Sequence, residues 1–230
     1  MLILFDVDDT LLDQETSVRL AATTLHRLVA SVSPVHQFCD RWIDALERHF
    51  ARYLRGEVSY QGQRRDRVRE VVDLGLTDEA ADRIVERYIT AYEANWCLFP
   101  DVIPCLDRLS GCRLGVVSNG QGEQQRKKLV QSGIIDRFEH VLISEEIGCA
   151  KPDSTIFRRA CALFGTAPSE SIYIGDRYET DAQAARMAGL RGIWLDRRRE
   201  VTDEHEPPLI HDLHAISPGG ILQVHGQATG

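Results

Sequence analysis

The chain has 230 residues, enough for one large domain or for a domain that carries a sizeable insertion. It holds 27 basic and 35 acidic residues, a formal net charge of −8, so we expect no general binding to nucleic acid or to anionic membranes. No stretch approaches the ~20 apolar residues that span a bilayer, and the N-terminal apolar run is too short for a signal peptide. Six scattered cysteines form no CxxC pair, which disfavours a zinc or redox site and indicates a reducing, cytoplasmic setting.

The chain begins with a short apolar strand that runs into a row of acids. Leu2–Phe5 is followed directly by Asp6, Asp8 and Asp9. Two like charges about 4 Å apart repel by roughly 4 kcal/mol at an effective dielectric near 20. A fold carries such a cost where a cation or a reaction requires it. The acids therefore indicate an active site, with a hard metal ion as the expected partner.

Residues 14–98 form a helical segment with no convincing strand. Apolar residues recur there at helical spacing, and Thr77 is placed to cap the start of a helix. We interpret this segment as an all-helical cap domain inserted into an α/β core of residues 1–13 and 99–230. Because the chain crosses between the two parts twice in one region, that region is a natural hinge for a lid.

From about residue 99, short β-rich runs alternate with helical segments. Together with Leu2–Phe5, the expected strands are Leu114–Val117, Val141–Ile143, Ile172–Ile174 and Gly192–Leu195. The expected helices lie near 102–109, 123–131, 154–164 and 181–188. This alternation predicts an open, parallel, Rossmann-like sheet flanked by helices. The stretch after about residue 200 is interpreted as a peripheral tail, held by apolar patches at 209–213 and 221–224.

A polar segment follows each of the first four strands. In an open parallel sheet, ligands bind beyond the carboxyl ends of the strands, so these segments should meet at one edge. In chain order they are Asp6-Val7-Asp8-Asp9-Thr10, Ser118-Asn119-Gly120, Glu145-Glu146 with Lys151-Pro152, and Gly175-Asp176 with Asp181.

This ordered set resembles the motifs of the haloacid dehalogenase superfamily, in its phosphatase branch. The likeness covers residues 1–13 and about 99–196, and the helical insert has the position and size of that superfamily's first-type cap. The run from Ile143 to Asp153 is similar to a subgroup of nucleotidases and sugar-phosphate phosphatases. The resemblance implies a Mg²⁺-dependent phosphatase acting on a small phosphomonoester, a nucleoside monophosphate or a sugar phosphate.

The resemblance and the chemistry of phosphate esters assign roles to four residues. A carboxylate can attack a phosphate once positive charge neutralises the ester, so Asp6 is expected to be the nucleophile that forms an aspartyl-phosphate. Asp8, two residues on, is expected to protonate the leaving oxygen and then to deprotonate the hydrolytic water. Ser118 would donate its hydroxyl to the phosphoryl oxygens, and Lys151 would supply a fixed positive charge.

The metal is expected to bind to oxygen ligands only, which suits Mg²⁺. Asp176 and Asp6 would bind it directly, together with the Asp8 carbonyl, while Asp181 would support that shell. One departure from the family pattern is Arg177, where a small polar residue is more common. Arg177 would contact neighbouring acids or approach the substrate.

The remaining polar residues have simpler interpretations. Asp9 is expected to be a turn residue. Thr10 would stabilise the loop through a side chain–backbone hydrogen bond, and it is also a candidate for phosphate binding. Asn119, a second such candidate, would either orient Asp8 or shape its turn. Glu145 and Glu146 are interpreted as the solvated start of a loop.

Two features of the cap admit both a structural and a functional interpretation. The arginines at 64, 65, 67 and 69 are expected to form a solvated helix face, with contact to an anionic substrate as the alternative. The aromatic residues Trp42, Tyr92 and Trp96 are expected to pack in the cap core rather than against substrate.

The sequence is compatible with other functions on this fold to different degrees. A 2-haloacid dehalogenase shares the nucleophile but needs neither the metal nor the second acid, so Asp8 and Asp176 argue against it. A phosphomutase needs cap groups that handle a sugar, and no marker decides for or against it. A non-catalytic binding module is disfavoured because all the acids are present. No G-x-G-x-x-G follows a strand, which argues against dinucleotide binding.

Overall fold

The computed structural model describes residues 1–200 and 207–221 of the chain. The chain divides into two compact units, Met1–Leu12 with Leu98–Gly230, and Asp13–Cys97. We call them the core unit and the helical unit. Their limits lie one residue from the limits expected for the α/β core and the cap. Among the described residues, no helix is long and apolar enough to cross a membrane.

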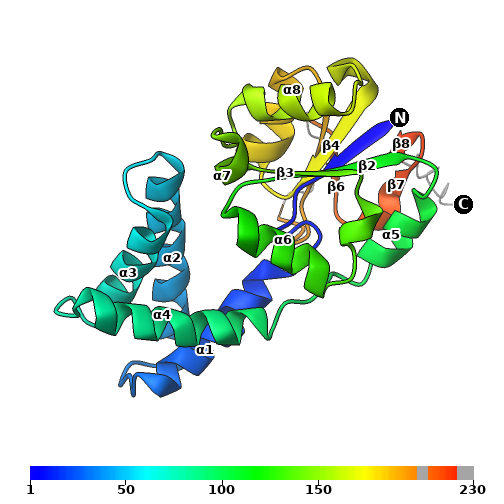
Figure 1. Cartoon of the computed structure of the whole chain (residues 1–230). Helices are drawn as coiled ribbons and strands as arrows, with labels where there is room; N and C mark the ends of the chain where they lie inside the picture. The colour runs from blue at the N-terminus through cyan, green and yellow to red at the C-terminus, as the bar shows by residue number, and fades with distance from the viewer. Residues whose placement is uncertain (201–206, 222–230) are drawn as a thin grey trace, which may run out of the picture. The chain divides into compact units, whose positions relative to one another are not determined.

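The core unit is built on a six-stranded sheet in the order β3-β2-β1-β4-β5-β6, and every neighbouring pair is parallel (Figure 1). The predicted α/β fold with a parallel sheet is thereby confirmed. The strands are β1 (Leu2–Phe5), β2 (Arg113–Ser118), β3 (His140–Ile143), β4 (Ser171–Gly175), β5 (Arg191–Leu195) and β6 (Leu209–Ile210).

The sixth strand corrects one expectation about the C-terminal stretch. Leu209 and Ile210 pair with β5 and extend the sheet, so this part of the stretch is not peripheral. The patch at 209–213 does hold it, as expected, because Ile210 and Leu213 are buried. A short antiparallel pair follows, β7 (Ile216–Ser217) with β8 (Gly220–Ile221). The rest of the apolar patch predicted at 221–224 lies outside the described residues.

Helices flank the sheet of the core unit, and Figure 1 shows α8 and α6 on opposite sides of it. They are α5 (Val102–Arg108), α6 (Gly122–Gln131), α7 (Ser144–Ile147), α8 (Ser154–Leu163) and α9 (Ala184–Met187). Short 3-10 turns cover Ile135–Arg137, Pro168–Glu170 and Leu213–Ala215. The helix predicted over 181–188 is a π-helical turn, Tyr178–Gln183, that leads into α9.

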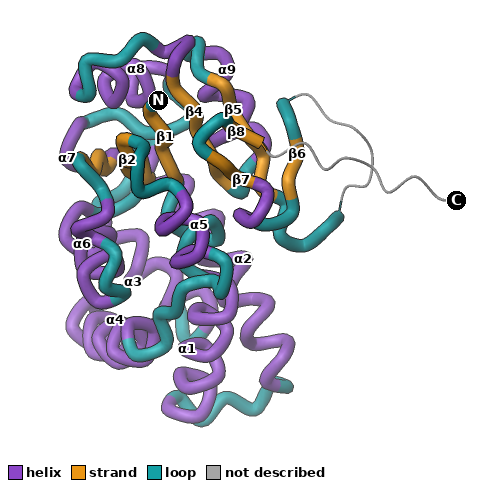
Figure 2. Tube along the Cα trace, turned by 90° about the vertical axis from the view of Figure 1, so that its right-hand side faces the viewer, coloured by secondary structure: helices purple, strands orange, loops and turns teal. Residues whose placement is uncertain are grey.

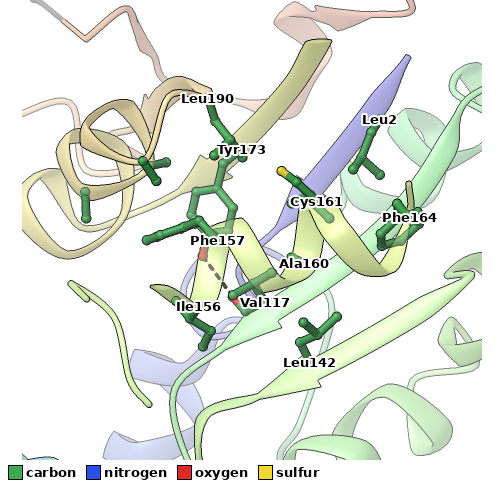
Figure 3. Packing of buried hydrophobic residues seen from close by; sticks show 14 residues of the cluster. Leu2, Val117, Leu142, Ile156, Phe157, Ala160, Cys161, Phe164, Tyr173 and Leu190 are labelled. Atoms are coloured by element: carbon green, nitrogen blue, oxygen red, sulfur yellow. Dashed lines mark hydrogen bonds between the residues drawn. The ribbon is translucent and has the colours of Figure 1, made fainter. Parts of the chain in front are cut away.

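One face of the sheet packs against α8 and α9. Leu2 and Leu4 of β1 belong to this buried cluster, together with Phe157 of α8 and Tyr173 of β4 (Figure 3). Strand side chains alternate, so Ile3 and Phe5, which are equally buried, face the other layer. Burying a large apolar side chain contributes about 1.5–3 kcal/mol. Because both faces of β1 are covered, the strand is held in place immediately before its acids.

The order of the strands places the acids at a reversal of the chain path. β1 lies between β2 and β4 (Figure 2). The sheet continues to β3 beyond β2 and to β5 and β6 beyond β4. At such a switch point the loops that leave neighbouring strands diverge and open a crevice at the carboxyl edge of the sheet. The residues that follow β1, β2 and β4 are therefore positioned by the fold to form a site.

The helical unit consists of four helices and no strand among its residues, all of which are described. They are α1 (Gln14–Leu28), α2 (Val35–Leu54), α3 (Tyr60–Val71) and α4 (Asp78–Glu93). Thr77 caps α4 as predicted, because its hydroxyl accepts the Ala80 N–H at 3.3 Å. Trp42 and Tyr92 are buried in the core of this unit, and Trp96 packs against it, as expected.

The arginine run of α3 is not a solvated helix face, and that expectation was wrong. Arg67 is buried, with its guanidinium 4.7 Å from the ring centre of Trp42 and 5.0 Å from that of Tyr88. Arg65 and Arg69 form ion pairs with acids of α4. A guanidinium is planar and weakly hydrated, so it can stack on aromatic rings inside a core where a lysine would not.

Candidate active site

The first acid after β1 is buried beside a buried lysine. The Nζ of Lys151 lies 2.8 Å from Oδ1 of Asp6 and 2.6 Å from Oδ1 of Asp181. It also donates to the hydroxyl of Tyr173 at 2.8 Å. These three contacts match the three N–H donors of an ammonium group. Lys151 therefore stays charged although only 3% of its surface is exposed, and the two acids keep its pKa raised against the opposing effect of burial.

Asn119 fixes the backbone that carries this lysine. Its side-chain Nδ2 donates to the carbonyl of Lys151 at 2.9 Å, and its Oδ1 accepts the Lys151 N–H at 2.8 Å. The Lys151–Pro152 peptide bond is cis. The sequence suggested that Asn119 orients Asp8 or only shapes its own turn. In the structure it joins the turn after β2 to the loop that presents Lys151.

Three carboxylates gather at the same edge of the sheet. Asp6, Asp176 and Asp181 each offer an oxygen, and these oxygens lie within 4.8 Å of one another. Burial raises the pKa of Asp6 to about 6, with Lys151 opposing the rise and Asp181 adding to it. Burial, followed by the charges of Asp181 and Asp6, raises the pKa of Asp176 well above its usual range. Acids that repel in this way, with oxygen ligands only, fit a hard divalent cation.

The π-helical turn brings Asp181 back to the end of β4. The N–H groups of Asp181 and Ala182 both donate to the carbonyl of Arg177, at 2.9 and 3.4 Å. Oδ2 of Asp181 in turn accepts the Arg177 N–H at 3.0 Å. A Cβ on Gly175 would lie 2.5 Å from Cγ of Asp181, so only glycine leaves room for this carboxylate. The wide turn and the glycine explain the spacing of the Gly-Asp…Asp motif.

Asp8 is held by two residues that the sequence did not single out. Its Oδ1 lies 2.5 Å from Nζ of Lys128, and its Oδ2 accepts a hydrogen bond from Nε2 of Gln125 at 2.8 Å. The same Nε2 donates to the hydroxyl of Ser118 at 2.9 Å. Gln125 and Lys128 lie three residues apart on α6 and both are buried. A polar pair at this spacing, directly after the Ser-Asn-Gly turn, was the signal that could have revealed them.

The remaining residues of the first loop have structural surroundings. Asp9 has φ of 53°, and its N–H donates to the Leu12 carbonyl at 2.8 Å, so the predicted turn residue is confirmed. The hydroxyl of Thr10 is fully buried and has no hydrogen-bond partner among the described residues. The expectation that the Thr10 side chain forms a hydrogen bond to the backbone was therefore wrong. The Thr10 carbonyl instead accepts from Arg197 at 2.7 Å.

Glu145 and Glu146 are exposed, as expected, but they lie on α7 and not in a loop. Glu145 accepts the N–H of Gly122 at 2.8 Å, and Glu146 pairs with Arg126 at 2.8 Å. Both contacts tie α7 to α6.

Arg177, where the family more often has a small polar residue, is exposed. Its positive charge lowers the pKa of Asp176 and so opposes the rise that burial causes.

Comparisons with known proteins point to one family. The family described as haloacid dehalogenase-like hydrolase matches residues 1–189. A phosphoserine phosphatase of Thermus thermophilus is 33% identical over 232 residues, which cover 90% of this chain and 93% of that protein. A glyceraldehyde 3-phosphate phosphatase of Methanopyrus kandleri is 32% identical over 201 residues, covering 85% of this chain and 83% of that protein.

Solved structures share the fold. The HAD-hydrolase YfnB of Bacillus subtilis, crystallised with magnesium, matches with a TM-score of 0.77 at 20% identity, over 93% of this chain and 95% of that one. A 2-haloacid dehalogenase of Pseudomonas syringae matches with a TM-score of 0.66 at 25% identity, over 92% and 94% of the two chains. The fold is thus shared by enzymes of different chemistry, and the side chains of the site must decide between them.

Proposed function

This chain belongs to the haloacid dehalogenase-like hydrolases, and from that premise we propose that it is a Mg²⁺-dependent phosphatase of small phosphomonoesters. The observation that carries the proposal is the buried set in which Lys151 lies between Asp6 and Asp181, beside Asp176. The substrate classes expected from the sequence are nucleoside monophosphates and sugar phosphates. The names of the two relatives add a phosphorylated amino acid and a phosphorylated triose.

Asp6 is the proposed nucleophile. A carboxylate oxygen of Asp6 would attack phosphorus, the bond to the leaving oxygen would break, and an aspartyl-phosphate would form. Lys151, fixed 2.8 Å from Asp6, would present positive charge to the phosphoryl oxygens. The hydroxyl of Ser118 and the N–H groups of its turn would donate to the same oxygens.

Asp8 is the proposed acid and base. An extended chain returns the side chain two residues on to the same face, so Asp8 can reach the leaving oxygen and protonate it. As the base, it would then take a proton from water, which attacks phosphorus and releases inorganic phosphate from Asp6.

The residues present fit Mg²⁺. Asp6 and Asp176 would bind it with the Asp8 carbonyl, and the ion would neutralise charge on the ester. Both oxygens of Asp181 accept hydrogen bonds from protein groups, which supports an indirect role for this residue. Asp181 would hold Lys151 and the Arg177 backbone in place.

The test is phosphate release from p-nitrophenyl phosphate and from a panel of phosphorylated metabolites, with Mg²⁺ or with EDTA. Asp6→Asn should abolish turnover and leave the fold intact. Asp9→Asn is the matched control, because it removes an acid of the same loop and asparagine tolerates the positive φ of that position. Folded protein that releases no phosphate from any substrate would disprove the proposal.

The second candidate is a 2-haloacid dehalogenase, which the shared fold favours. Such a reaction needs neither the metal nor the second acid, so it gives no reason for a buried acid cluster around Asp176 or for the two contacts on Asp8. Chloride release from 2-haloacids in EDTA would establish it. A phosphomutase would reveal itself by isomerising a sugar phosphate faster than it releases phosphate.

Two further expectations remain proposals. The helical unit would act as the cap that selects the substrate, with the chain crossings near residues 12–13 and 97–98 as the hinge. The protein would act in the cytoplasm. Kinetics of variants of the helical unit on the substrate panel would test the first proposal, and fractionation of cells would test the second.

A further inference from the structure

We propose that Lys128 and Gln125 are positioning residues that orient Asp8 for proton transfer. The inference rests on the proposed function, because a fixed orientation of Asp8 matters only if this acid exchanges protons with the leaving group and with water. Neither residue belongs to the motifs by which the chain resembles its family. Both lie on α6, the helix that follows the turn after β2.

The burial of Lys128 requires an explanation. Only 2% of the residue is exposed, whereas lysine is almost never fully buried without a partner. Transferring an ammonium group out of water is unfavourable unless a nearby negative charge compensates. The carboxylate of Asp8, 2.5 Å away, provides the compensation.

Lys128 and Gln125 contact different oxygens of the Asp8 carboxylate. Lys128 contacts Oδ1 and Gln125 donates to Oδ2, so rotation about both side-chain bonds of Asp8 is restricted. Nε2 of Gln125 also lies 2.9 Å from the hydroxyl of Ser118 and 3.0 Å from the carbonyl of Asn119, so its two N–H groups are shared among three acceptors. The orientation of Asp8 is thereby tied to the turn that would bind the phosphoryl group.

Each of the two proposed catalytic acids therefore has its own buried lysine. Lys151 pairs with Asp6, and Lys128 pairs with Asp8. The side chain of Asp8 is 21% exposed, which leaves part of it open to substrate and water. Lys128, in contrast, is covered, so it would act through Asp8 rather than on the phosphoryl group. Without it, Asp8 would sample orientations from which it reaches neither the leaving oxygen nor the attacking water.

A double-mutant cycle tests this role on p-nitrophenyl phosphate with Mg²⁺. We expect Lys128→Met to lower kcat about 10-fold or more and to change KM less than about 3-fold. The loss should not exceed the ~10²–10⁴-fold that general acid–base catalysis supplies in total. In an Asp8→Asn background the same substitution should cost less than about 2-fold, because the residue it positions is already inactive. Lys128→Arg should restore part of the activity.

A pre-steady-state measurement separates positioning from general damage. p-Nitrophenolate departs as a stabilised anion with little need of a proton, whereas breakdown of the aspartyl-phosphate needs Asp8 as a base. Lys128→Met should therefore release a burst of p-nitrophenolate before a slow steady state. Lys127→Met, on the same helix but exposed, is the charge-matched control and should behave as wild type. Thermal melts check that each variant is folded.

The outcomes are distinct. If wild-type protein hydrolyses phosphate esters and Lys128→Met is fully active, or loses as much in the Asp8→Asn background as alone, the inference is overturned and the proposed function stands. If wild-type protein hydrolyses no phosphate ester, both fail. Should Lys128→Met not fold, Gln125→Met takes its place, with the same dependence on Asp8 expected and its absence again overturning the inference.

Discussion

Replacing Lys151 by methionine should make the protein less stable without metal and more responsive to Mg²⁺. Methionine has a similar length, so little cavity is created. What is lost is the positive charge that pairs with both Asp6 and Asp181. Removing one partner of a buried ion pair costs about 3–5 kcal/mol. For a chain of this size each kcal/mol lowers Tm by about 2–4 °C, so we expect a fall of roughly 6–20 °C in EDTA.

Mg²⁺ should reverse much of that loss. Lysine and the metal are attracted to the same carboxylates, and charges of +1 and +2 about 5 Å apart repel by roughly 7 kcal/mol at a dielectric near 20. Without Lys151 the ion should bind more tightly, although turnover falls by about 10²-fold or more because the phosphoryl oxygens lose a fixed charge. At a hundred times its Kd, any ligand stabilises by about 2.7 kcal/mol, so tighter binding gives a larger shift at a given concentration.

Calorimetry with EDTA and with a series of Mg²⁺ concentrations measures both effects, on the transition that responds to the ion. Lys127→Met serves as the control, because it removes a charge from an exposed position. Two results would refute the reasoning. One is an unchanged Tm in EDTA, which would mean that the acids do not need the lysine. The other is a Mg²⁺ shift equal to or smaller than that of wild type, which would mean that lysine and metal do not compete.

Three further predictions concern other charges. Asp176→Asn should raise Tm in EDTA, because burial and like charges disfavour this carboxylate. It should also abolish turnover and the rise in Tm that Mg²⁺ causes. A retained rise in Tm would exclude Asp176 as a ligand. Arg67→Met should leave the free energy of unfolding in urea unchanged or raise it. Burial disfavours the charge of Arg67 and lowers its pKa, and aromatic stacking offsets only about 0.5–2 kcal/mol of the cost of burying that charge. A loss of several kcal/mol would contradict this account. Asp101→Asn should cost about 3 kcal/mol at neutral pH. Burial opposes the ionisation of Asp101, but Arg197 and the Leu213 N–H lower its pKa overall. The stabilising effect of Asp101 is therefore complete above the unfolded pKa near 4 and is lost as pH falls through the folded pKa. Urea titrations of wild type and Asp101→Asn should give the same unfolding free energy in acid. A difference in unfolding free energy that stays constant with pH would refute the assignment.

Local patterns determined the framework of this protein. Apolar runs of three or four residues between helical segments predicted five of the six strands of the sheet. Parallel strands end at one edge, so the polar residues that follow β1 and β4 had to lie close together. The cluster of Asp6, Asp176 and Asp181 follows from that topology. The identity of these acids was readable because motif spacing is a property of the chain itself.

The partners of the side chains were decided only in the tertiary structure. Lys128 looks like a surface lysine in the sequence, and it is buried because α6 turns it towards an acid 120 residues away. Arg67 looks solvated, and it is enclosed by rings from two other helices. The sequence by itself determined which residues are proposed to carry the chemistry, because strand ends and motif spacing are local. The structure decided which residues hold them in place, because such contacts depend on distances between segments far apart in the chain.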